Sequence, residues 1–600
     1  MCGIAAFYSY ADANPINIDL LARVRDFMHS RGPDDKGIYQ SDNKTLGMAH
    51  RRLSIIDLSD KAHQPMMDAN GNAVLVFNGE IYNYKSLRTA LIKKGYVFNT
   101  NSDTEVILNL YLDRGLEFVN ALQGMFALAL YDKRAEMLVL ARDPFGIKPL
   151  YYYDNGKQIS IASQVRALRQ IPEIKTMPFE PAGQVGFYMT GSIPEPYTLY
   201  RNIFALPAGS IMCVSRHKKP VTRRYFDSTQ TFLNVQNPIA KQMPVVPVKK
   251  IYHSIVESVE KHLVADVPVG VFLSSGLDSS LILAIIRQEL GYKVQTVTLG
   301  FEAYRGTVRD ETLLAERVAN TFETEHKTIW LDSDDFFEHE TAFFEAMDQP
   351  TIDGLNTYFV SMAAKKVGLK VALSGVGGDE LFAGYNTFSH VPRMVRNFGW
   401  VPKPMGRLFR QLGVNCMGKL VSPKQASVFE YSQTLLDAYW LKRCLTLPWQ
   451  LKQVLPASVV HEGWQKLAPI LFPVSKAQFR NARQFVSACE IDFYMKNQLL
   501  RDTDWASMAH SLEVRIPFVD KCLFSEVMPL MGNLKLFKQQ LFSLFSSSLP
   551  KALLEREKTG FYVPVREWLM AKSDQKALSM QHWATHVYKN FGGVGETVGY

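Results

Sequence analysis

The chain has 600 residues, a formal net charge of +9, 47% hydrophobic residues and 21% charged residues. These proportions are ordinary for globular proteins and exclude a wholly disordered chain, a collagen-like fibre and a disulfide-rich mini-protein. A mild positive charge spread over so long a chain is compatible with anionic small molecules, a nucleic acid or an acidic surface, and does not choose among them.

The six cysteines are sparse, none has C-x-x-C spacing, and none pairs with nearby histidines as a zinc site would. This usage favours a reducing compartment. No apolar run approaches the roughly 18 residues of a membrane span, and the N-terminus lacks the basic and apolar segments of a signal peptide. We therefore predict a cytoplasmic protein without a membrane partner.

The first half of the chain predicts stacked antiparallel sheets flanked by helices. Short apolar strands separated by turn residues are predicted at 73–77, 124–131, 137–141 and 158–162. Helices are predicted at 18–29 and 104–114, with Ser102 or Asp103 as the cap of the second. Between about residues 227 and 250 the composition becomes polar and proline-containing, which indicates a linker.

Strand–turn–helix alternation follows the linker and predicts a doubly wound parallel sheet. Buried strands are expected at 267–273, 293–299 and 371–374, and helices at 279–288 and 311–322. Ligands of such sheets bind at the carboxyl ends of the strands, where Ser/Gly-rich turns occur in this sequence. From about residue 392 to 488 the pattern is helical.

Cys2 becomes a candidate nucleophile if Met1 is removed, because its own α-amine can then take the thiol proton, directly or through a water. By itself a cysteine at this position is usually without functional meaning. Four later segments change that balance: SRGPDDKG at 30–37, MAHRRLSIIDLSD at 48–60, FNGEIYN at 77–83 and TNSDTEVIL at 100–108.

Each segment also has a structural alternative. Arg52 is a charged fork suited to a substrate carboxylate, or a surface arginine. The Asn78 side chain and the Gly79 N–H suit an oxyanion, or they form a hairpin turn. Asp103 can pair with an ammonium group, or it only caps a helix. As pure pattern, residues 30–37 are a turn.

Together and in this order, these segments resemble the class II glutamine amidotransferases over roughly the first 210 residues. The resemblance implies an α+β N-terminal-nucleophile domain, an αββα sandwich, in which Cys2 forms a glutamyl thioester and releases ammonia. It implies that Asn78 and Gly79 stabilise the oxyanion. The implied glutamine-binding residues are Arg52, Ile55, Asn78, Glu80 and Asp103.

Two positions depart from that family pattern. His29 and Ser30 stand where the family usually has Arg-His before RGPD. Ser163 and Gln164 replace the usual Ser-Glu of an F-A-S-E segment. Neither departure removes a catalytic group of the glutaminase. The second departure bears on the path between the glutaminase site and the site in the second half of the chain.

The segment DVPVGVFLSSGLDSSL, residues 266–281, delivers a Ser/Gly-rich turn from a buried strand into a helix. Backbone N–H groups and hydroxyls there can cradle a phosphate, and Asp278 can bind Mg²⁺ that bridges phosphates. For S-G alone, an ordinary strand–helix loop is the alternative. The full S-x-G-x-D-S pattern resembles the loop of ATP-pyrophosphatases, with Ser275 replacing the first glycine, and does not have Walker A spacing.

With the segments at 372–385, 501–520 and 556–569, the second half resembles the synthetase domain of glutamine-dependent asparagine synthetases. This implies a doubly wound α/β, adenine-nucleotide α-hydrolase-like domain with a largely helical C-terminal part. The implied ATP and pyrophosphate residues are Leu273, Ser274, Gly276, Asp278, Ser279, Ser280 and Gly375. Asp278 and Asp379 are the implied Mg²⁺ ligands, and Lys558 the implied catalytic cation. From the residues alone, Glu513, Arg515 and Asp520 are as well explained as buried scaffold.

We therefore predict a glutaminase domain at 1–210, a linker at 211–249, a synthetase-type ATP-pyrophosphatase domain at 250–585 and a tail at 586–600. The resemblance implies that glutamine, ATP and aspartate are the substrates. Ammonia from glutamine would attack β-aspartyl-AMP and give asparagine, glutamate, AMP and pyrophosphate.

Val376 stands where asparagine synthetases typically carry an acid implicated in ammonia attack, and an aliphatic side chain cannot transfer a proton. Another group or water then does that work, or the acceptor is a different carboxylate such as a sugar uronic acid. The stretch 347–359 is a candidate acceptor-facing segment. The oligomeric state stays open, with a homodimer as one alternative.

A non-catalytic nucleic-acid-binding protein is the hypothesis from another class. The net charge of +9 and basic–aromatic stretches such as 393–410 prompt it. We expect no nucleic-acid partner, because no recognition motif appears. These stretches are better explained as a solvated helical face with a buried aromatic stripe.

Overall fold

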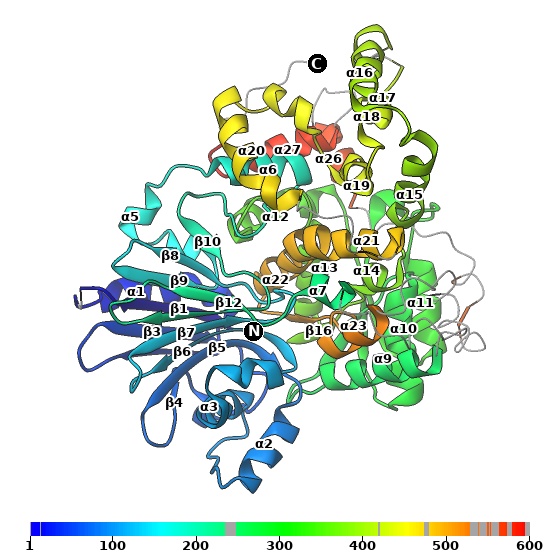
Figure 1. The fold of residues 1–600 in the computed structure, drawn as a ribbon. Helices are drawn as coiled ribbons and strands as arrows, with labels where there is room; N and C mark the ends of the chain where they lie inside the picture. The colour runs from blue at the N-terminus through cyan, green and yellow to red at the C-terminus, as the bar shows by residue number, and fades with distance from the viewer. Residues whose placement is uncertain are drawn as a thin grey trace.

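The computed structural model describes residues 2–12, 14–233, 248–417, 420–472, 479, 481–528, 538, 549–550, 553, 563–572 and 579–593. In these residues, two antiparallel sheets occupy the N-terminal part, and a parallel sheet follows residue 248 (Figure 1). Across the described ranges, no helix combines the length and apolar character that a membrane crossing requires. The predicted catalytic cation, Lys558, lies outside the described residues.

The two antiparallel sheets have six strands each. The first has the order β10 (Ile203–Ala205), β8 (Tyr151–Asp154), β9 (Gln158–Ala162), β1 (Gly3–Ser9), β3 (Leu46–Arg52) and β2 (Asp35–Gln40). The second has the order β12 (Val221–Arg224), β11 (Ser210–Ser215), β7 (Met137–Arg142), β6 (Gly124–Asp132), β5 (Ala73–Ile81) and β4 (Met66–Met67). Both sheets are fully antiparallel, as the sequence predicts.

Side-chain alternation along the strands produces four layers, because successive residues point to opposite faces. In β1, Ile4 and Ala6 join a core shared by the two sheets. Phe7 joins a different core with the apolar residues of α1 (Ile18–Phe27). On the far side of the second sheet, Phe77 packs with α2 (Tyr84–Lys93) and α3 (Asp103–Arg114). The layer order is therefore helix, sheet, sheet, helix.

The third sheet has the order β15 (Glu325–Leu331), β14 (Gln295–Phe301), β13 (Val269–Phe272), β16 (Val371–Leu373) and β17 (Glu513–Arg515). All four strand pairs are parallel, in agreement with the predicted doubly wound sheet. The chain runs outward from β13 to β15 and then continues on the other side with β16. The strand order thus reverses between β13 and β16, which is where doubly wound folds bind ligands.

Helices surround this sheet. They are α9 (Val248–His262), α10 (Leu277–Ala284), α11 (Thr312–Thr321), α12 (Ser333–Ala346), α13 (Leu355–Lys366), α14 (Gly378–Phe382), α22 (Leu500–Met508), α23 (Lys521–Val527) and α26 (Val565–Lys572). The predicted helix at 279–288 begins two residues earlier, at Leu277, and ends in a π-helical turn over Ile285–Glu289.

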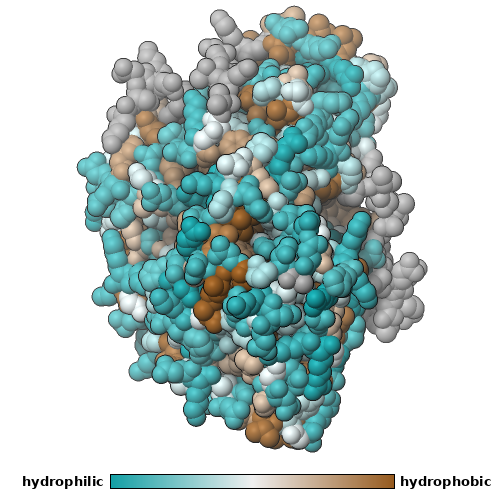
Figure 2. Space-filling model, turned by 90° about the vertical axis from the view of Figure 1, so that its left-hand side faces the viewer, coloured by the Kyte–Doolittle hydropathy of each residue, from teal (hydrophilic) through white to brown (hydrophobic). Residues whose placement is uncertain are grey.

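A helical region extends above the parallel sheet in Figure 1, as predicted for residues 392–488. It contains α15 (Thr387–Phe398), α16 (Lys403–Met417), α17 (Pro423–Ala426), α18 (Val428–Tyr431), α19 (Leu435–Arg443), α20 (Ala457–Leu471) and α21 (Ala482–Cys489). Helix α20 packs against α6 (Pro181–Thr190) of the N-terminal part. The face shown in Figure 2 is mainly hydrophilic, with a hydrophobic band near its middle and further hydrophobic residues at its upper edge.

Two predicted segment boundaries differ from the structure. Residues 211–224, expected in the linker, form most of β11 and all of β12 at the edge of the second sheet. The expected boundary at 585 lies inside α27 (Met580–Asn590), where buried Tyr588 donates to Gln184 Oε1 at 2.7 Å. In both places apolar residues pack into the fold next to polar stretches that dominate the composition. Residues 234–247 of the expected linker lie outside the described residues.

Candidate functional sites

Cys2 lies directly before β1 and is only 7% exposed. Its N–H donates to Asn78 Oδ1 at 2.9 Å, and its carbonyl accepts from Arg31 Nε at 3.0 Å. Burial raises the pKa of the Cys2 thiol, while the Leu53 backbone N–H and the Arg52 charge offset part of that rise. The backbone of Cys2 is thus held on both sides beside two cationic groups.

Asn78 and Gly79 are not in a hairpin turn, the structural alternative for this pair, but inside β5, opposite Ala127 and Phe126 of β6. Asn78 is fully buried, and its Nδ2 has no hydrogen-bond partner among the described residues. Gly79 has φ +152°, and a Cβ there would lie 2.0 Å from the Met125 carbonyl oxygen. An unsatisfied buried amide donor is rare and is a feature expected of a group that awaits an anion.

The other predicted glutamine-binding residues lie in the same domain. Arg52 is buried, and its guanidinium donates to the carbonyls of Ile56, Asp57 and Ser59. Ile55 is buried as well. These carbonyl contacts fix the direction of the guanidinium before any ligand arrives.

Asp103 begins α3, and Ser102 is the cap of this helix, since its hydroxyl accepts from the Glu105 N–H. Asp103 Oδ2 instead accepts from the Ile81 N–H at 3.0 Å. Burial raises the pKa of Asp103 to about 6, and hydrogen bonds from backbone N–H groups limit the rise. The carboxylate is therefore mostly ionised at neutral pH and can pair with an ammonium group.

Glu80 contacts the second domain. Its Oε2 lies 3.5 Å from Arg515 Nη2, and Arg515 Nε in turn donates to Glu513 Oε1 at 2.6 Å. Burial and the nearby Glu513 raise the pKa of Glu80, whereas Arg515 lowers it. Glu513 and Arg515 are fully buried, and Asp520 caps α23 by accepting from two backbone N–H groups. The scaffold interpretation of these three residues therefore accounts for their positions.

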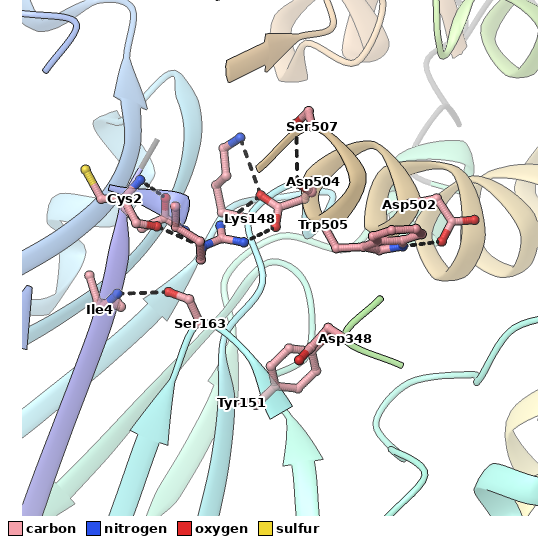
Figure 3. A network of polar contacts seen from close by, with 12 residues as sticks. Cys2, Ile4, Lys148, Tyr151, Ser163, Asp348, Asp502, Asp504, Trp505 and Ser507 are labelled. Atoms are coloured by element: carbon pink, nitrogen blue, oxygen red, sulfur yellow. Dashed lines mark hydrogen bonds and ion pairs between the residues drawn. The ribbon is translucent and has the colours of Figure 1, made fainter. Parts of the chain in front are cut away.

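A second buried contact joins Cys2 to the parallel-sheet domain (Figure 3). Arg31, whose Nε donates to the Cys2 carbonyl, also forms a bidentate ion pair with Asp504 of α22. The Nη1–Oδ2 distance is 2.7 Å and the Nη2–Oδ1 distance is 3.1 Å. Lys148 Nζ lies 3.9 Å from the same carboxylate. Arg31 is fully buried and Asp504 is 3% exposed. The arginine of the RGPD segment, a turn as pure pattern, therefore links the cysteine to the other domain.

Replacing Asp504 with alanine should lower the free energy of unfolding by about 3 kcal/mol or more, because the Arg31 charge stays buried without its partner. Urea unfolding followed by tryptophan fluorescence measures the change. Asp504→Asn, which retains a hydrogen-bond acceptor, should cost less. Glu302→Ala removes an exposed ion pair with Arg305 and should have little effect. An equal response of Asp504→Ala and Glu302→Ala would contradict this role.

A cavity of 1010 Å³ opens at the reversal point of the parallel sheet. The loops after β13 and β16 form one wall, which contains the predicted Leu273, Ser274, Gly276, Asp278, Ser279, Gly375 and Asp379. Its other walls are rich in aromatic residues, namely Tyr385, Tyr439, Trp440, Phe493, Tyr494 and Trp583.

Serine side chains brace the loop after β13. The Gly276 N–H donates to Ser274 Oγ at 3.1 Å, and Ser274 Oγ and Ser279 Oγ lie 3.0 Å apart. Ser280, predicted to hold pyrophosphate, is fully buried outside the cavity lining, and its hydroxyl donates to the Gly276 carbonyl. Ser280 therefore supports the loop from behind, because it lies on the inward face of α10.

Asp278 and Asp379 converge on one cation. Lys538 Nζ lies 2.8 Å from Asp278 Oδ2 and 2.7 Å from Asp379 Oδ1. The two carboxylates raise the pKa of Lys538 against the opposing effect of burial. Sequence reasoning missed Lys538, since no motif surrounds it.

Val376 lines this cavity, and a buried acid lies four residues further on. Burial and the neighbouring Asp379 raise the pKa of Glu380 to about 7, and Glu380 Oε1 accepts from the Tyr385 hydroxyl at 2.6 Å. The DE pair within the predicted segment was the available signal for Glu380, although the pattern assigned a role only to Asp379.

The two halves of the stretch 347–359 lie in different parts of the structure. Asp348 accepts from the Val165 and Arg166 N–H groups at 2.9 Å and so caps α4 (Val165–Leu168) across the domain interface. Further along, Ile352, Asp353, Leu355, Asn356 and Thr357 line the cavity. The second half of this predicted segment therefore faces the cavity, and the first half does not.

Comparison with known families matches the two parts of the chain separately. The family described as "Glutamine amidotransferase domain" matches residues 1–226, and the family described as "Asparagine synthase" matches residues 250–588.

Among curated proteins, the chain is 31% identical to asparagine synthetase [glutamine-hydrolyzing] 1 of Bacillus subtilis, over 95% of this chain and 88% of that one. It is 35% identical to asparagine synthetase B of Escherichia coli, over 65% and 66%. It is also 27% identical to the amidase chyE of Penicillium rubens, over 89% and 83%. Among solved structures, the glutamine phosphoribosylpyrophosphate amidotransferase of B. subtilis matches with a TM-score of 0.28 and 15% identity, over 55% of this chain and 65% of that chain.

Proposed function

Because the chain belongs to the glutamine-hydrolysing asparagine synthetase family, an enzyme family of carbon–nitrogen ligases, we propose that it amidates aspartate with nitrogen from glutamine at the expense of ATP. One observation carries the proposal. A single chain contains two sites. In one, the buried Cys2 lies beside the Asn78 side-chain amide, whose N–H donor has no partner among the described residues. In the other, Asp278 and Asp379 line a cavity and both contact the ammonium group of Lys538.

In the first half-reaction, the Cys2 sulfur attacks the side-chain amide carbon of glutamine. Asn78 Nδ2 and the Gly79 N–H stabilise the negative oxygen of the tetrahedral adduct, which then expels ammonia. Water hydrolyses the remaining thioester to glutamate. Once Met1 is removed, the nitrogen that contacts Asn78 Oδ1 is an α-amine and can accept the thiol proton.

In the second half-reaction, a carboxylate oxygen of aspartate attacks the α-phosphorus of ATP, and pyrophosphate leaves. Ammonia then attacks the acyl carbon of the adenylate, loses a proton and displaces AMP. Activation is required because a free carboxylate is a poor acyl donor. The loop of Ser274, Gly276 and Ser279 lies at a helix N-terminus, where backbone N–H groups favour the negative pyrophosphate.

The residues present fit Mg²⁺. Carboxylate oxygens are the ligands that this ion prefers, and Asp278 and Asp379 already converge on a single positive charge. Bound there, the ion would neutralise charge on the departing pyrophosphate. Lys538 Nζ now lies between the two carboxylates, so binding of the ion there would require the ammonium group to move away or to one side.

Proton removal from the attacking ammonia needs a group other than Val376. Glu380 is a cavity-lining carboxyl group, and its pKa of about 7 suits a general base near neutral pH. Glu380 is therefore our candidate for this role.

The proposal is tested by incubating the purified enzyme with glutamine, MgATP and aspartate. We expect asparagine, glutamate, AMP and pyrophosphate in equal amounts. Formation of ADP and phosphate would contradict the ATP-pyrophosphatase assignment, and glutamate formation without asparagine would contradict aspartate as the acceptor.

A second acceptor class is supported by Val376 and by the aromatic walls of the cavity. Tyrosine and tryptophan rings commonly pack against apolar faces, and a sugar uronic acid offers such a face together with its carboxylate. The same assay with a hexuronate in place of aspartate discriminates between the two. Pyrophosphate release that depends on the hexuronate and not on aspartate would favour this alternative.

A further inference from the structure

Helix α16 presents an apolar stripe to solvent. Met405, Leu408, Phe409 and Leu412 follow the spacing i, i+3, i+4 and i+7, which puts them on one face of a helix. Their side chains are between 41% and 53% exposed. An amphipathic helix of a globular protein normally turns such a stripe toward the core.

The neighbouring face of α16 packs against the protein, and the Phe409 ring at the edge of the stripe has its centroid 5.4 Å from that of the Phe429 ring. A Cβ on Gly406 would lie 2.5 Å from the Phe429 carbonyl oxygen, so this face touches α18 closely. Arg410 also points there and pairs with Glu430, which is 5% exposed. These contacts fix the rotation of α16, and the apolar stripe faces outward as a consequence.

Two further exposed apolar side chains flank α16 in the sequence. Trp400 precedes α16 and is 76% exposed, and Leu420 follows it and is 83% exposed. The Trp400 indole N–H donates to the Asn397 carbonyl at 2.9 Å, which ties down the polar edge of the ring. We call Trp400, Leu420 and the four stripe residues the α16 face.

The same segment is basic, although Glu430 at its end pairs with Arg407 and Arg410. Between Glu380 and Glu430 the sequence has no aspartate or glutamate and seven lysines and arginines, against a net +9 for all 600 residues. Arg393 and Arg396 on the preceding helix α15 and Lys403 at the start of α16 are exposed, and Lys403 Nζ lies 3.8 Å from Asp437 Oδ2. The expectation of a buried aromatic stripe in residues 393–410 is wrong for Trp400 and Phe409, which are 76% and 41% exposed.

We propose that the α16 face docks on an anionic lipid surface, which departs from the expectation from the sequence of no membrane partner. Helices that lie in a membrane interface combine Trp, Phe and Leu on one side with Lys and Arg around them, and the basic residues attract acidic headgroups. In Figure 1, α16 is the uppermost helix. The absence of a spanning helix among the described residues does not oppose such peripheral binding.

Other occupants fit the charges or the apolar residues but not both. A second copy of the chain in a two-fold arrangement would place one basic segment against another, which is unfavourable. A nucleic acid would use the arginines and lysines for its phosphates but leave the aliphatic stripe without a partner. An anionic bilayer accommodates both features.

Co-sedimentation of the full-length protein with vesicles tests the proposal. One vesicle preparation contains phosphatidylcholine alone, and the other has about a third of it replaced by phosphatidylglycerol. We expect clearly tighter binding to the anionic vesicles, by about tenfold or more, and a decrease with added salt. Leu408→Ser/Leu412→Ser and Arg393→Glu/Lys403→Glu should each weaken that binding by about tenfold.

The matched control is Val308→Ser/Leu313→Ser, which removes two exposed apolar side chains elsewhere, 93% and 59% exposed. This control should bind like the unaltered protein, and glutamine hydrolysis should be the same in all variants. Equal vesicle binding by the variants and the control, or no preference for anionic vesicles, would overturn the proposal. So would a dimer that Leu408→Ser/Leu412→Ser dissociates, or binding of a DNA duplex that only the charge variant weakens.

Discussion

Cys2→Ala is expected to abolish glutamine-dependent product formation, by at least about a thousandfold, while ammonium salts still support it. The sulfur is the atom that attacks glutamine in the proposed first half-reaction. The cavity where the acceptor is activated belongs to other strands, β13 and β16, and ammonia supplied from solution bypasses the cysteine. Amide formation is measured with each nitrogen source in turn.

Cys213→Ala provides the control for Cys2→Ala. Cys213 lies half-buried in β11 of the same domain and takes no part in the proposed chemistry. Its replacement should leave both activities unchanged. Loss of ammonia-dependent synthesis in Cys2→Ala would show that the two sites cannot be separated in this way.

Asp278→Ala is expected to reduce synthesis at least about a hundredfold with either nitrogen source, because it removes one of two carboxylates that would hold Mg²⁺. It also leaves Lys538 with Asp379 as its remaining partner of the pair. Glutamine hydrolysis should continue, since Cys2, Asn78 and Asp103 are untouched. Pyrophosphate release and glutamate formation are therefore measured side by side.

Asp334→Ala is a suitable comparison for Asp278→Ala. Asp334 also lies in the first turn of a helix, α12, but is exposed and lies outside the cavity lining. Synthesis should proceed normally in that variant. Retained synthesis in Asp278→Ala would eliminate the proposed role of this carboxylate.

The parts of the site that sequence patterns predicted are short and contiguous. FNGEIYN contains Asn78, Gly79 and Glu80, and residues 266–281 contain the strand, the turn and the first helical turn of the second site. Local spacing is sufficient for such features, because the motif residues lie within one strand–turn–helix unit. The predicted helix at 104–114 is α3, and the predicted strands of the first half are β5, β6, β7 and β9.

Contacts between residues far apart in the sequence could not be predicted from local patterns. Arg31 and Asp504 are 473 positions apart, and the sequence alone does not indicate that they pair. Lys538 approaches Asp278 over a separation of 260 positions. Arg31 and Asp278 lie in motif segments, but the spacing of those segments does not predict Asp504 and Lys538 as their partners.

The sequence by itself indicated the family, and from its motifs it predicted the two kinds of chemistry and the residues proposed to carry them. Only the tertiary structure decided which buried charges meet across the domain interface, that Ser280 supports its loop from behind, and that the stripe of α16 faces solvent. Helical spacing predicts that an apolar stripe exists, but the direction that the stripe faces depends on which side of the helix packs against the rest of the protein. Gly406 and Arg410 of α16 contact α18, and the stripe is therefore exposed to solvent.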